Sequence, residues 1–261
     1  MKVVAIIQAR CASTRFPNKV FADLCGKPFI WHVINRLKFV QTLDHITLAT
    51  TDRPSDDKLY YWAKENGVDV YRGSESNVLN RYYEAAVYSK ADVIVRITAD
   101  DPFKEPVLID EAVNALQKGG YDFVCNNCPP SYPEGLDIEV LTKTALEKEE
   151  KLSTSDFERE HVTQYIYHHP EDFKIFNLSN VGENLSYLRW TVDTEKDFQM
   201  VTRIYSSLYK NDSEIFHMND ILQLLREHPE IGKMNSDVAR SEMYKSCLLY
   251  TSPSPRDGAT S

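Results

Sequence analysis

The chain has 261 residues, a formal net charge of −9 and a hydrophobic fraction of 42%, which suits one large α/β domain or two small ones. The acidic balance argues against a nucleic-acid-binding surface, because binding phosphate backbones needs clustered Lys and Arg. No apolar run approaches the roughly 18 residues of a membrane-spanning helix. The short run at 3–7 is followed by Arg10 and does not resemble a signal peptide, so we expect a cytoplasmic protein with no membrane partner.

The first half of the chain alternates short β-branched runs with longer amphipathic segments. The expected strands are 2–8, 46–50, 68–71, 93–98 and 123–126. The expected helices are 29–39, 55–65, 78–89 and 106–118. This alternation predicts an α/β fold with a mostly parallel, mixed sheet that helices cover on both faces.

The second half is less regular and shows no internal repeat. We expect strands at 136–141, 173–179 and 188–192, and helices at 142–151, 155–168, 194–208 and 219–227. Thr194 to Asp197 resembles a capping box at the start of the third of these helices. We predict one domain over 1–246. Residues 247–261 contain Thr-Ser-Pro-Ser-Pro-Arg without periodicity, which is typical of a non-native or disordered tail.

The five cysteines do not form a disulfide framework, because they are odd in number and irregularly spaced. Cys125 and Cys128 have half of a zinc-site spacing. The sequence has no second such pair, and no close pair of histidines completes the site, so we expect reduced thiols at a strand end.

A basic loop follows the first expected strand and reads Gln-Ala-Arg-Cys-Ala-Ser-Thr-Arg-Phe-Pro-Asn-Lys over residues 8–19. Ligands of open α/β sheets bind at the carboxyl ends of the strands. Arg10, Arg15 and Lys19 offer positive charge, and Ser13 and backbone N–H groups offer donors, so the loop suits a polyphosphate. The alternative is a solvated basic turn.

Carboxylates follow two further strands. Asp100 and Asp101 come one residue after 93–98, and Asp193 follows 188–192. One or two carboxylates together with phosphate oxygens and water are a typical environment for Mg²⁺. Asp-Asp-Pro is equally a turn and helix-start signal, and Asp193 is equally a candidate helix cap.

The basic loop resembles the cytidylyltransferase loop Q/P-A-R-x-x-S-T-R-x-P-x-K of sugar-activating enzymes. More narrowly, the chain is similar to the cytidylyltransferase family of spore coat polysaccharide biosynthesis, which is related to CMP-sialic acid and CMP-KDO synthetases. The matching stretches run in order over about residues 3–245. They are Ile7–Lys19, Tyr71–Ser74, Arg81–Ala85, Val95–Asp100, Tyr132–Glu139, Glu158–Thr163 and Leu188–Asp193.

The resemblance implies a nucleotide-diphospho-sugar transferase fold, which is Rossmann-like, and a set of site residues. The nucleotide would contact Ala9, Arg10, Ser13, Arg15, Lys19 and Arg72. Mg²⁺ would be held by Asp100 and Asp193, and these two with Arg15 and Lys19 would form the catalytic set. The acceptor sugar would face Tyr132, Asp137, Glu139, Arg159 and His161. A neutral core histidine is an equal alternative for His161.

The chain departs from the family pattern at four positions. Ala12, Asn18 and Ala99 stand where relatives usually have Gly, and Asp101 replaces the usual Cys. Asn tolerates a left-handed backbone, whereas Ala there would cost roughly 1 kcal/mol or more. We therefore expect either no positive φ at the two alanines or a shifted loop.

The function that the resemblance implies is Mg²⁺-dependent transfer of CMP from CTP to an acidic sugar, with release of pyrophosphate, for surface polysaccharide or glycan synthesis. A homodimer is compatible with it. The first alternative is a glycosyltransferase with a similar nucleotide-binding fold. The second is a catalytically silent nucleotide-binding protein, since fold alone does not settle function.

Overall fold

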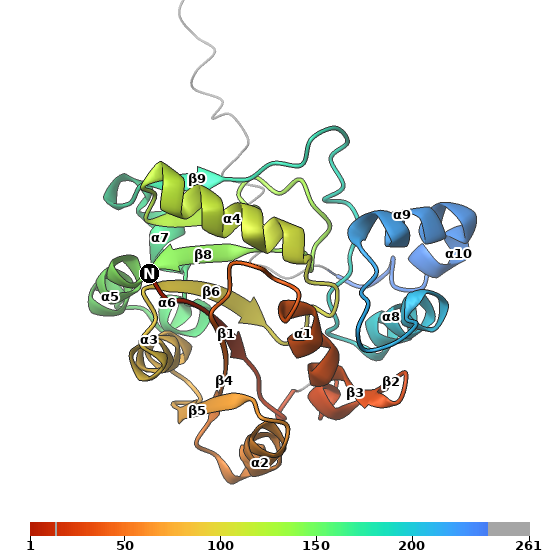
Figure 1. Cartoon of the computed structure of the whole chain (residues 1–261), viewed down its shortest axis with the longest axis horizontal. Helices are drawn as coiled ribbons and strands as arrows, with labels where there is room; N and C mark the ends of the chain where they lie inside the picture. The colour runs from red at the N-terminus through yellow and green to blue at the C-terminus, as the bar shows by residue number, and fades with distance from the viewer. Residues whose placement is uncertain (14, 240–261) are drawn as a thin grey trace, which may run out of the picture.

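A computed structural model describes residues 1–13 and 15–239 of the chain. Its centre is a seven-stranded sheet of order β5-β4-β1-β6-β8-β7-β9 (Figure 1). The strands are β1 (Val3–Gln8), β4 (His45–Thr51), β5 (Asp69–Gly73), β6 (Val93–Thr98), β7 (Phe123–Cys125), β8 (Glu139–Thr142) and β9 (Ile175–Asn177). The expected tail, residues 247–261, lies outside the described residues.

The sheet is mixed and mostly parallel, as predicted. The strands β5, β4, β1 and β6 run parallel to one another, whereas β8 is antiparallel to both β6 and β7. The last pair, β7 and β9, is again parallel. The central strands are buried on both faces, which explains why they read as continuous apolar runs rather than alternating ones.

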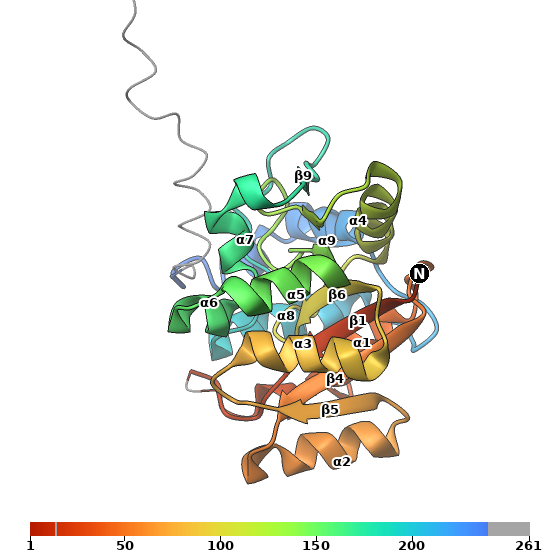
Figure 2. The same ribbon diagram turned by 90° about the vertical axis from the view of Figure 1, so that its left-hand side faces the viewer.

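Helices cover both faces of the sheet. Val3, Ala5 and Ile7 of β1 join one buried cluster, and Val4 and Ile6 join the other, because successive side chains of a strand point to opposite faces. The first cluster includes side chains of α1 (Phe29–Leu37), α2 (Asp57–Glu65), α4 (Pro106–Gly119), α8 (Glu195–Leu208), α9 (Met218–Glu227) and α10 (Pro229–Gly232). The second includes α3 (Val78–Ser89), α5 (Lys143–Leu152) and α7 (Gln164–His168), and Figure 2 shows α3 and α5 on this face.

Strand register brings two predicted site segments together. The last residue of β1, Gln8, pairs with the last residue of β6, Thr98. The loops that follow these strands therefore leave the sheet side by side at the same edge. A third segment joins them there, because Val192 N–H donates to the Asp100 carbonyl at 2.9 Å.

The strand expected at 188–192 does not form. Arg189 makes one isolated bridge with Glu134, which consists of two backbone bonds, and the segment makes one further backbone bond to a second loop, from Val192 N–H to the Asp100 carbonyl. Gly135, at φ +103°, allows this close approach, since a Cβ there would lie 2.8 Å from the Thr191 nitrogen. An alternating sequence indicates that one face of a segment is buried. It does not indicate whether a neighbouring strand is present to pair with that segment.

The helix expected over 155–168 is two helices, α6 (Asp156–His161) and α7. Val162 separates them at φ 65°. This conformation is costly for a β-branched residue, and the Val162 side chain is buried in the second cluster. The helical pattern continues across the break, so periodicity alone did not reveal it. The strands expected at 136–141 and 173–179 are shorter than predicted.

Short elements complete the described chain. They are the hairpin of β2 (Asp23–Leu24) and β3 (Lys27–Pro28) and the 3₁₀ turns η1 (Lys19–Phe21), η2 (Pro54–Asp56) and η3 (Pro170–Asp172). Over residues 1–13 and 15–239, none of the helices has the length and apolar character needed to cross a membrane.

Candidate active site

A cavity of about 910 Å³ opens at the carboxyl edge of β1 and β6. Its wall combines the basic loop, the turn after β6, the start of α3 and the helix α6. The predicted site residues that line it are Ala9, Arg10, Ser13, Arg15, Lys19, Asp100, Arg159, His161 and Asp193. Segments that are up to about 180 residues apart in sequence thus share one space, where parallel α/β sheets generally bind their ligands.

The basic loop folds back on itself after β1. The N–H of Asn18 donates to the Cys11 carbonyl at 3.0 Å, and Asn18 has φ 57° and ψ 22°. Asn18 therefore adopts the left-handed conformation that Asn tolerates. Among the described non-glycine residues with positive φ, neither Ala12 nor Ala99 appears. The loss of Gly at these two positions thus costs no backbone strain.

Asp56, which the sequence did not single out, anchors this loop. Its side chain is buried in η2, accepts the Cys11 N–H at 2.6 Å and accepts a hydrogen bond from the Thr51 hydroxyl. A buried carboxylate with two donors holds the loop against the end of β4. The sequence signal was weak, because Pro54-Ser-Asp56 is also an ordinary helix start.

Lys19 lies between the two predicted metal ligands. Its Nζ is 3.7 Å from Asp100 Oδ2 and 3.7 Å from Asp193 Oδ1, and it donates to the Val192 carbonyl at 2.6 Å. Arg15 Nη2 lies 3.2 Å from Asp193 Oδ1. Two cations of the loop and two acids distant in sequence therefore form one charged cluster at the cavity.

Asp100 remains a carboxylate in this cluster. Burial by itself raises the pKa of Asp100, but the Lys19 ammonium and the Thr98 hydroxyl outweigh it, and the pKa lies below its usual range. Its Oδ1 is buried without a hydrogen-bond partner among the described residues. An unpartnered anionic oxygen beside a second carboxylate fits a hard divalent cation. The same residues contain no cluster of three or more potential metal ligands, so phosphate and water would complete the coordination.

Asp101 points away from the cavity, although it is adjacent to Asp100 in sequence. It accepts hydrogen bonds from the Thr98 hydroxyl at 2.7 Å and from Lys104 Nζ at 2.9 Å, and both it and Lys104 are buried. Burial raises the pKa of Asp101, and the nearby Asp100 carboxylate adds to this effect. The negative charge of Asp101, which stands in place of the usual Cys, is thus paired inside the protein with the buried Lys104.

Asp193 does not cap α8. The N-cap is Thr194, whose hydroxyl accepts the Asp197 N–H while the Asp197 carboxylate accepts the Thr194 N–H, as the predicted capping box requires. The Asp193 carboxylate instead receives Arg189 Nη2 on Oδ2 at 2.9 Å. Its other oxygen, Oδ1, faces Lys19 and Arg15.

A further basic residue lines the cavity, Arg81 on α3, which was not predicted as a site residue. Its side chain is 2% exposed, donates to the Ser74 carbonyl and has an unpartnered buried Nε. Burial lowers the pKa of Arg81. The predicted Arg10 lies on the same side, with Nη1 at 3.9 Å from Glu75 Oε1. The cavity therefore carries positive charge on two of its walls.

The α6 wall contains two predicted acceptor residues, Arg159 and His161. Arg159 is tied to Glu150, with Nη1 at 3.1 Å from Oε2, and to the Ser153 carbonyl at 2.9 Å. Burial lowers the pKa of His161, so the neutral form is favoured. His161 is half-buried, and its ring packs on Phe157 at 4.6 Å between centroids.

The other predicted acceptor residues do not line this cavity. Glu139 is buried and receives hydrogen bonds from Arg96, Thr163 at 3.0 Å and Tyr167 at 2.8 Å. Tyr132 is packed in the first hydrophobic cluster. Asp137 accepts the Gly135 N–H at 3.1 Å, and burial raises the pKa of Asp137 to about 7. The structure gives all three side chains contacts within the protein.

Arg72 also lies outside the cavity lining. Its Nη1 is 2.7 Å from Asp57 Oδ1, and its guanidinium donates to the Thr51 and Arg53 carbonyls and lies over the Tyr60 ring. These contacts join β5 to α2. A nucleotide contact for Arg72 remains a prediction.

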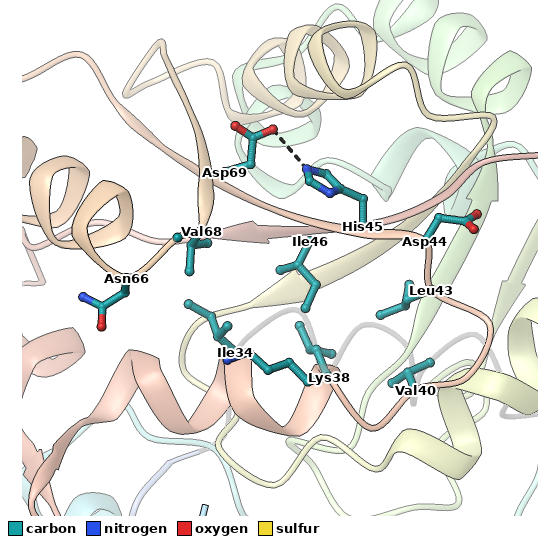
Figure 3. Close-up of a pocket in the computed structure, with 12 residues that line it drawn as sticks. Ile34, Lys38, Val40, Leu43, Asp44, His45, Ile46, Asn66, Val68 and Asp69 are labelled. Carbon is teal, nitrogen blue, oxygen red and sulfur yellow. Dashed lines mark hydrogen bonds and ion pairs between the residues drawn. The ribbon is translucent and has the colours of Figure 1, made fainter. Parts of the chain in front are cut away.

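A smaller cavity of about 310 Å³ lies at the opposite edge of the sheet, between α1 and the starts of β4 and β5 (Figure 3). Apolar side chains such as Ile34 and Val68 form its floor, and the ion pair of His45 Nε2 with Asp69 Oδ2, 3.1 Å apart, lies at its rim. None of the predicted site residues lines it.

Four cysteines lie in the described part of the chain, and all four are free thiols. Cys125 ends β7, where its Sγ lies 3.4 Å from Asn177 Oδ1, and the Cys128 N–H donates to the same oxygen at 3.0 Å. The two cysteines therefore contact a shared amide at the strand end. Cys247 lies outside the described residues.

A family model described as cytidylyltransferase matches residues 4–243. The spore coat polysaccharide biosynthesis protein SpsF of Bacillus subtilis is 29% identical over 236 residues, which cover 87% of this chain and 95% of that protein. A 3-deoxy-manno-octulosonate cytidylyltransferase of Geobacter metallireducens is 35% identical over 116 residues, or 44% of this chain and 45% of that protein.

Solved structures agree with these sequence matches. The structure of a cytidylyltransferase from Leptospira borgpetersenii serovar Hardjo-bovis has a TM-score of 0.83 and 32% identity, and covers 88% of this chain and 96% of its own. The predicted fold class and the resemblance to the spore coat polysaccharide type and to CMP-KDO synthetases are both confirmed. The chain belongs to the cytidylyltransferase family.

Proposed function

We propose that this enzyme transfers CMP from CTP to an acidic sugar in a Mg²⁺-dependent reaction that serves surface polysaccharide or glycan synthesis. The observation that carries the proposal is the convergence of Arg15, Lys19, Asp100 and Asp193 at one cavity. The acidic class of acceptor is supported by the similarity to a 3-deoxy-manno-octulosonate cytidylyltransferase. The glycan context is supported by the full-length similarity to the spore coat protein.

In the proposed reaction, a hydroxyl oxygen of the sugar attacks the α-phosphorus of CTP in line and loses its proton to water. The new P–O bond to the sugar forms as the bond between the α-phosphorus and the bridging oxygen breaks, and pyrophosphate leaves with that electron pair. Most of the catalysis is positioning and charge stabilisation, as in phosphoryl transfer generally. Asp100 and Asp193 would hold Mg²⁺, which would supply charge neutralisation at the phosphates.

In this proposal, the basic loop stabilises the pyrophosphate leaving group. Arg15 and Lys19 contact Asp193 and Asp100 in the structure, and a triphosphate offers these cations phosphate oxygens at the same place. Arg15 is half-exposed, so its guanidinium can turn toward the ligand and hold two oxygens at once. Together the two side chains stabilise the negative charge that develops on pyrophosphate.

The nucleotide and acceptor occupy different ends of the cavity in this proposal. Arg10, Ser13 and the Ala9 backbone bind the nucleotide, beside Arg81 and the start of α3. His161 and Arg159 on α6 lie next to the acceptor. Because Arg159 is already paired with Glu150, it contributes orientation more than uncompensated charge.

A pyrophosphate-release screen tests the proposal. The enzyme is incubated with Mg²⁺ and each nucleoside triphosphate against a panel of sugar acids that includes 3-deoxy-ulosonic and nonulosonic acids. We expect release with CTP and at least one sugar acid, and loss of release in EDTA. Binding of CTP without release for any acceptor supports a silent nucleotide-binding protein. Turnover of a nucleotide sugar without pyrophosphate supports a glycosyltransferase. Either result overturns the proposal.

A further inference from the structure

Arg189 connects the candidate metal site to the protein interior. Its side chain is 5% exposed and contacts three carboxylates. Nη1 is 2.9 Å from Glu134 Oε1, Nη2 is 2.9 Å from Asp193 Oδ2, and Nε is 3.1 Å from Asp197 Oδ1. The planar guanidinium fixes the relative directions of these bonds, which a point-charge ammonium cannot do.

Asp193 is held from two sides by this arrangement. Its side chain receives Arg189, and its backbone N–H donates to Asp197 Oδ2 at 3.0 Å. The same Asp197 is buried and receives Arg189 and the Asn235 amide, the latter at 2.8 Å. Both the backbone and the carboxylate of Asp193 are therefore tied to one buried network.

The direction of the Arg189 bond decides which Asp193 oxygen is available. Oδ2 is engaged on the interior side, whereas Oδ1 faces Lys19 and Arg15 at the cavity. A carboxylate without this partner could rotate about its side-chain torsions and present either oxygen, or neither. Partners behind a metal ligand typically change metal affinity in this way, by about 10–100-fold.

We propose that Arg189 is a positioning residue that presents Asp193 Oδ1 to the divalent cation. The inference rests on the proposed metal role of Asp193. It does not make Arg189 a catalytic residue, because Arg189 is absent from the wall of the nucleotide cavity. It lines a different cavity, of about 630 Å³, between the 180–190 segment and the helices α8, α9 and α10.

The direct test measures binding of Mn²⁺ alone to the full chain, by electron paramagnetic resonance of the free ion. We compare the wild type with Arg189→Lys and with Glu134→Gln, which removes a charged partner of Arg189 that does not contact Asp193. The Mn²⁺ dissociation constant should rise about 10–100-fold in Arg189→Lys and stay within about twofold in Glu134→Gln. The Mg²⁺ concentration for half-maximal pyrophosphate release should rise in parallel with the first change.

Thermal unfolding in EDTA separates positioning from folding. Both variants disturb a buried network, so both are expected to unfold at lower temperature, but only Arg189→Lys should weaken metal binding. Wild-type Mn²⁺ affinity in Arg189→Lys, or equal weakening in the two variants, overturns the inference while leaving the proposed function intact. Failure of the wild type to bind Mn²⁺, both alone and with CTP, overturns the inference and the proposed metal site together.

A second variant keeps the test decisive if Arg189→Lys does not fold. The cavity beside Arg189 can admit a small cation, so Arg189→Ala is assayed with millimolar guanidinium and, as a control, ammonium. Guanidinium should restore Mn²⁺ affinity and ammonium should not, because only the planar ion reproduces the fork of donors. No restoration by guanidinium, or equal restoration by both ions, overturns the inference.

Discussion

Two adjacent carboxylates at the end of β6 have opposite surroundings. Asp100 faces the cavity and Lys19, whereas Asp101 faces the interior and Lys104. β6 ends at Thr98 and the chain turns at residues 99–100, so the neighbouring side chains diverge. Asp100 is therefore a candidate metal ligand, whereas Asp101 is a structural acid. Substitutions of these two residues should have different consequences.

Asp100→Asn should reduce catalysis without reducing stability. The amide keeps the size of the side chain but cannot bind a hard cation as an anion, so pyrophosphate release should fall about 10²–10³-fold. The unfolding temperature should stay close to that of the wild type, because the Asp100 side chain makes few bonds inside the protein. Steady-state kinetics with CTP and thermal unfolding are measured on the same preparation.

Asp101→Asn is the matched control for that experiment. It leaves the buried Lys104 ammonium with a neutral partner, so the free energy of unfolding should fall by about 1–3 kcal/mol. Turnover of the folded protein should change much less than in Asp100→Asn. The assignment of the two acids is wrong if the pattern is reversed, with Asp101→Asn inactive and Asp100→Asn active.

The raised pKa of Asp137 predicts a pH dependence of stability. Burial holds this pKa at about 7 in the folded chain, against about 3.9 in an unfolded one. Between these values the native state binds more protons than the unfolded state, so this group makes stability fall as pH rises. Asp137→Asn removes the effect, and its advantage over the wild type should grow from near zero at about pH 4 to roughly 4 kcal/mol at about pH 8.

Urea unfolding of Asp137→Asn across this pH range provides the measurement. The exposed Asp52→Asn serves as a control that removes an equal charge. An advantage of Asp137→Asn that does not change with pH, or that is shared by Asp52→Asn, would contradict the raised pKa.

At the scale of elements, the basic loop depends on Asn18. Its left-handed backbone, φ 57°, closes the loop onto the Cys11 carbonyl. Asn18→Ala should lower the free energy of unfolding by about 1 kcal/mol, and Asn18→Gly should not, because Gly adopts this conformation without a Cβ penalty. The KM for CTP should rise in the Ala variant as the loop loses its geometry. Equal stability and equal KM in the two variants would show that the turn does not control the loop.

The elements also show where sequence patterns succeed. The four parallel strands and their helices were predicted because each is a local pattern of apolar residues with clear ends. The segment 188–192 was wrongly predicted as a strand, since it alternates like one but pairs only through an isolated bridge to one loop and a single backbone bond to another. The break at Val162 was missed, because a buried valine fits the helical pattern on either side of it.

For the site, too, sequence patterns predicted some features and missed others. Loops after β1 and β6 were expected at one edge, because parallel strands end together, and the register of Gln8 with Thr98 places them there. The anchoring by Asp56 and the wall contributed by Arg81 depend on tertiary contacts that no spacing reveals. For the same reason, the internal partners of Glu139 were not foreseeable from its matching motif.

At the scale of the whole molecule, the span of the two hydrophobic clusters indicates which residues form the folding unit. The buried members of both clusters lie between Val3 and Ile231, and the family match ends at residue 243. Removal of 247–261 should therefore leave folding and activity unchanged, with the unfolding temperature within about 1–2 °C of the full chain.

We would compare the full chain with a chain ending at Ser246 by calorimetry and by pyrophosphate release. A matched truncation that ends at Ile221 removes core side chains of α9 and α10 and should fail to fold. A larger loss of stability or activity on removal of 247–261 would mean that the segment packs on the domain, and would contradict the predicted boundary.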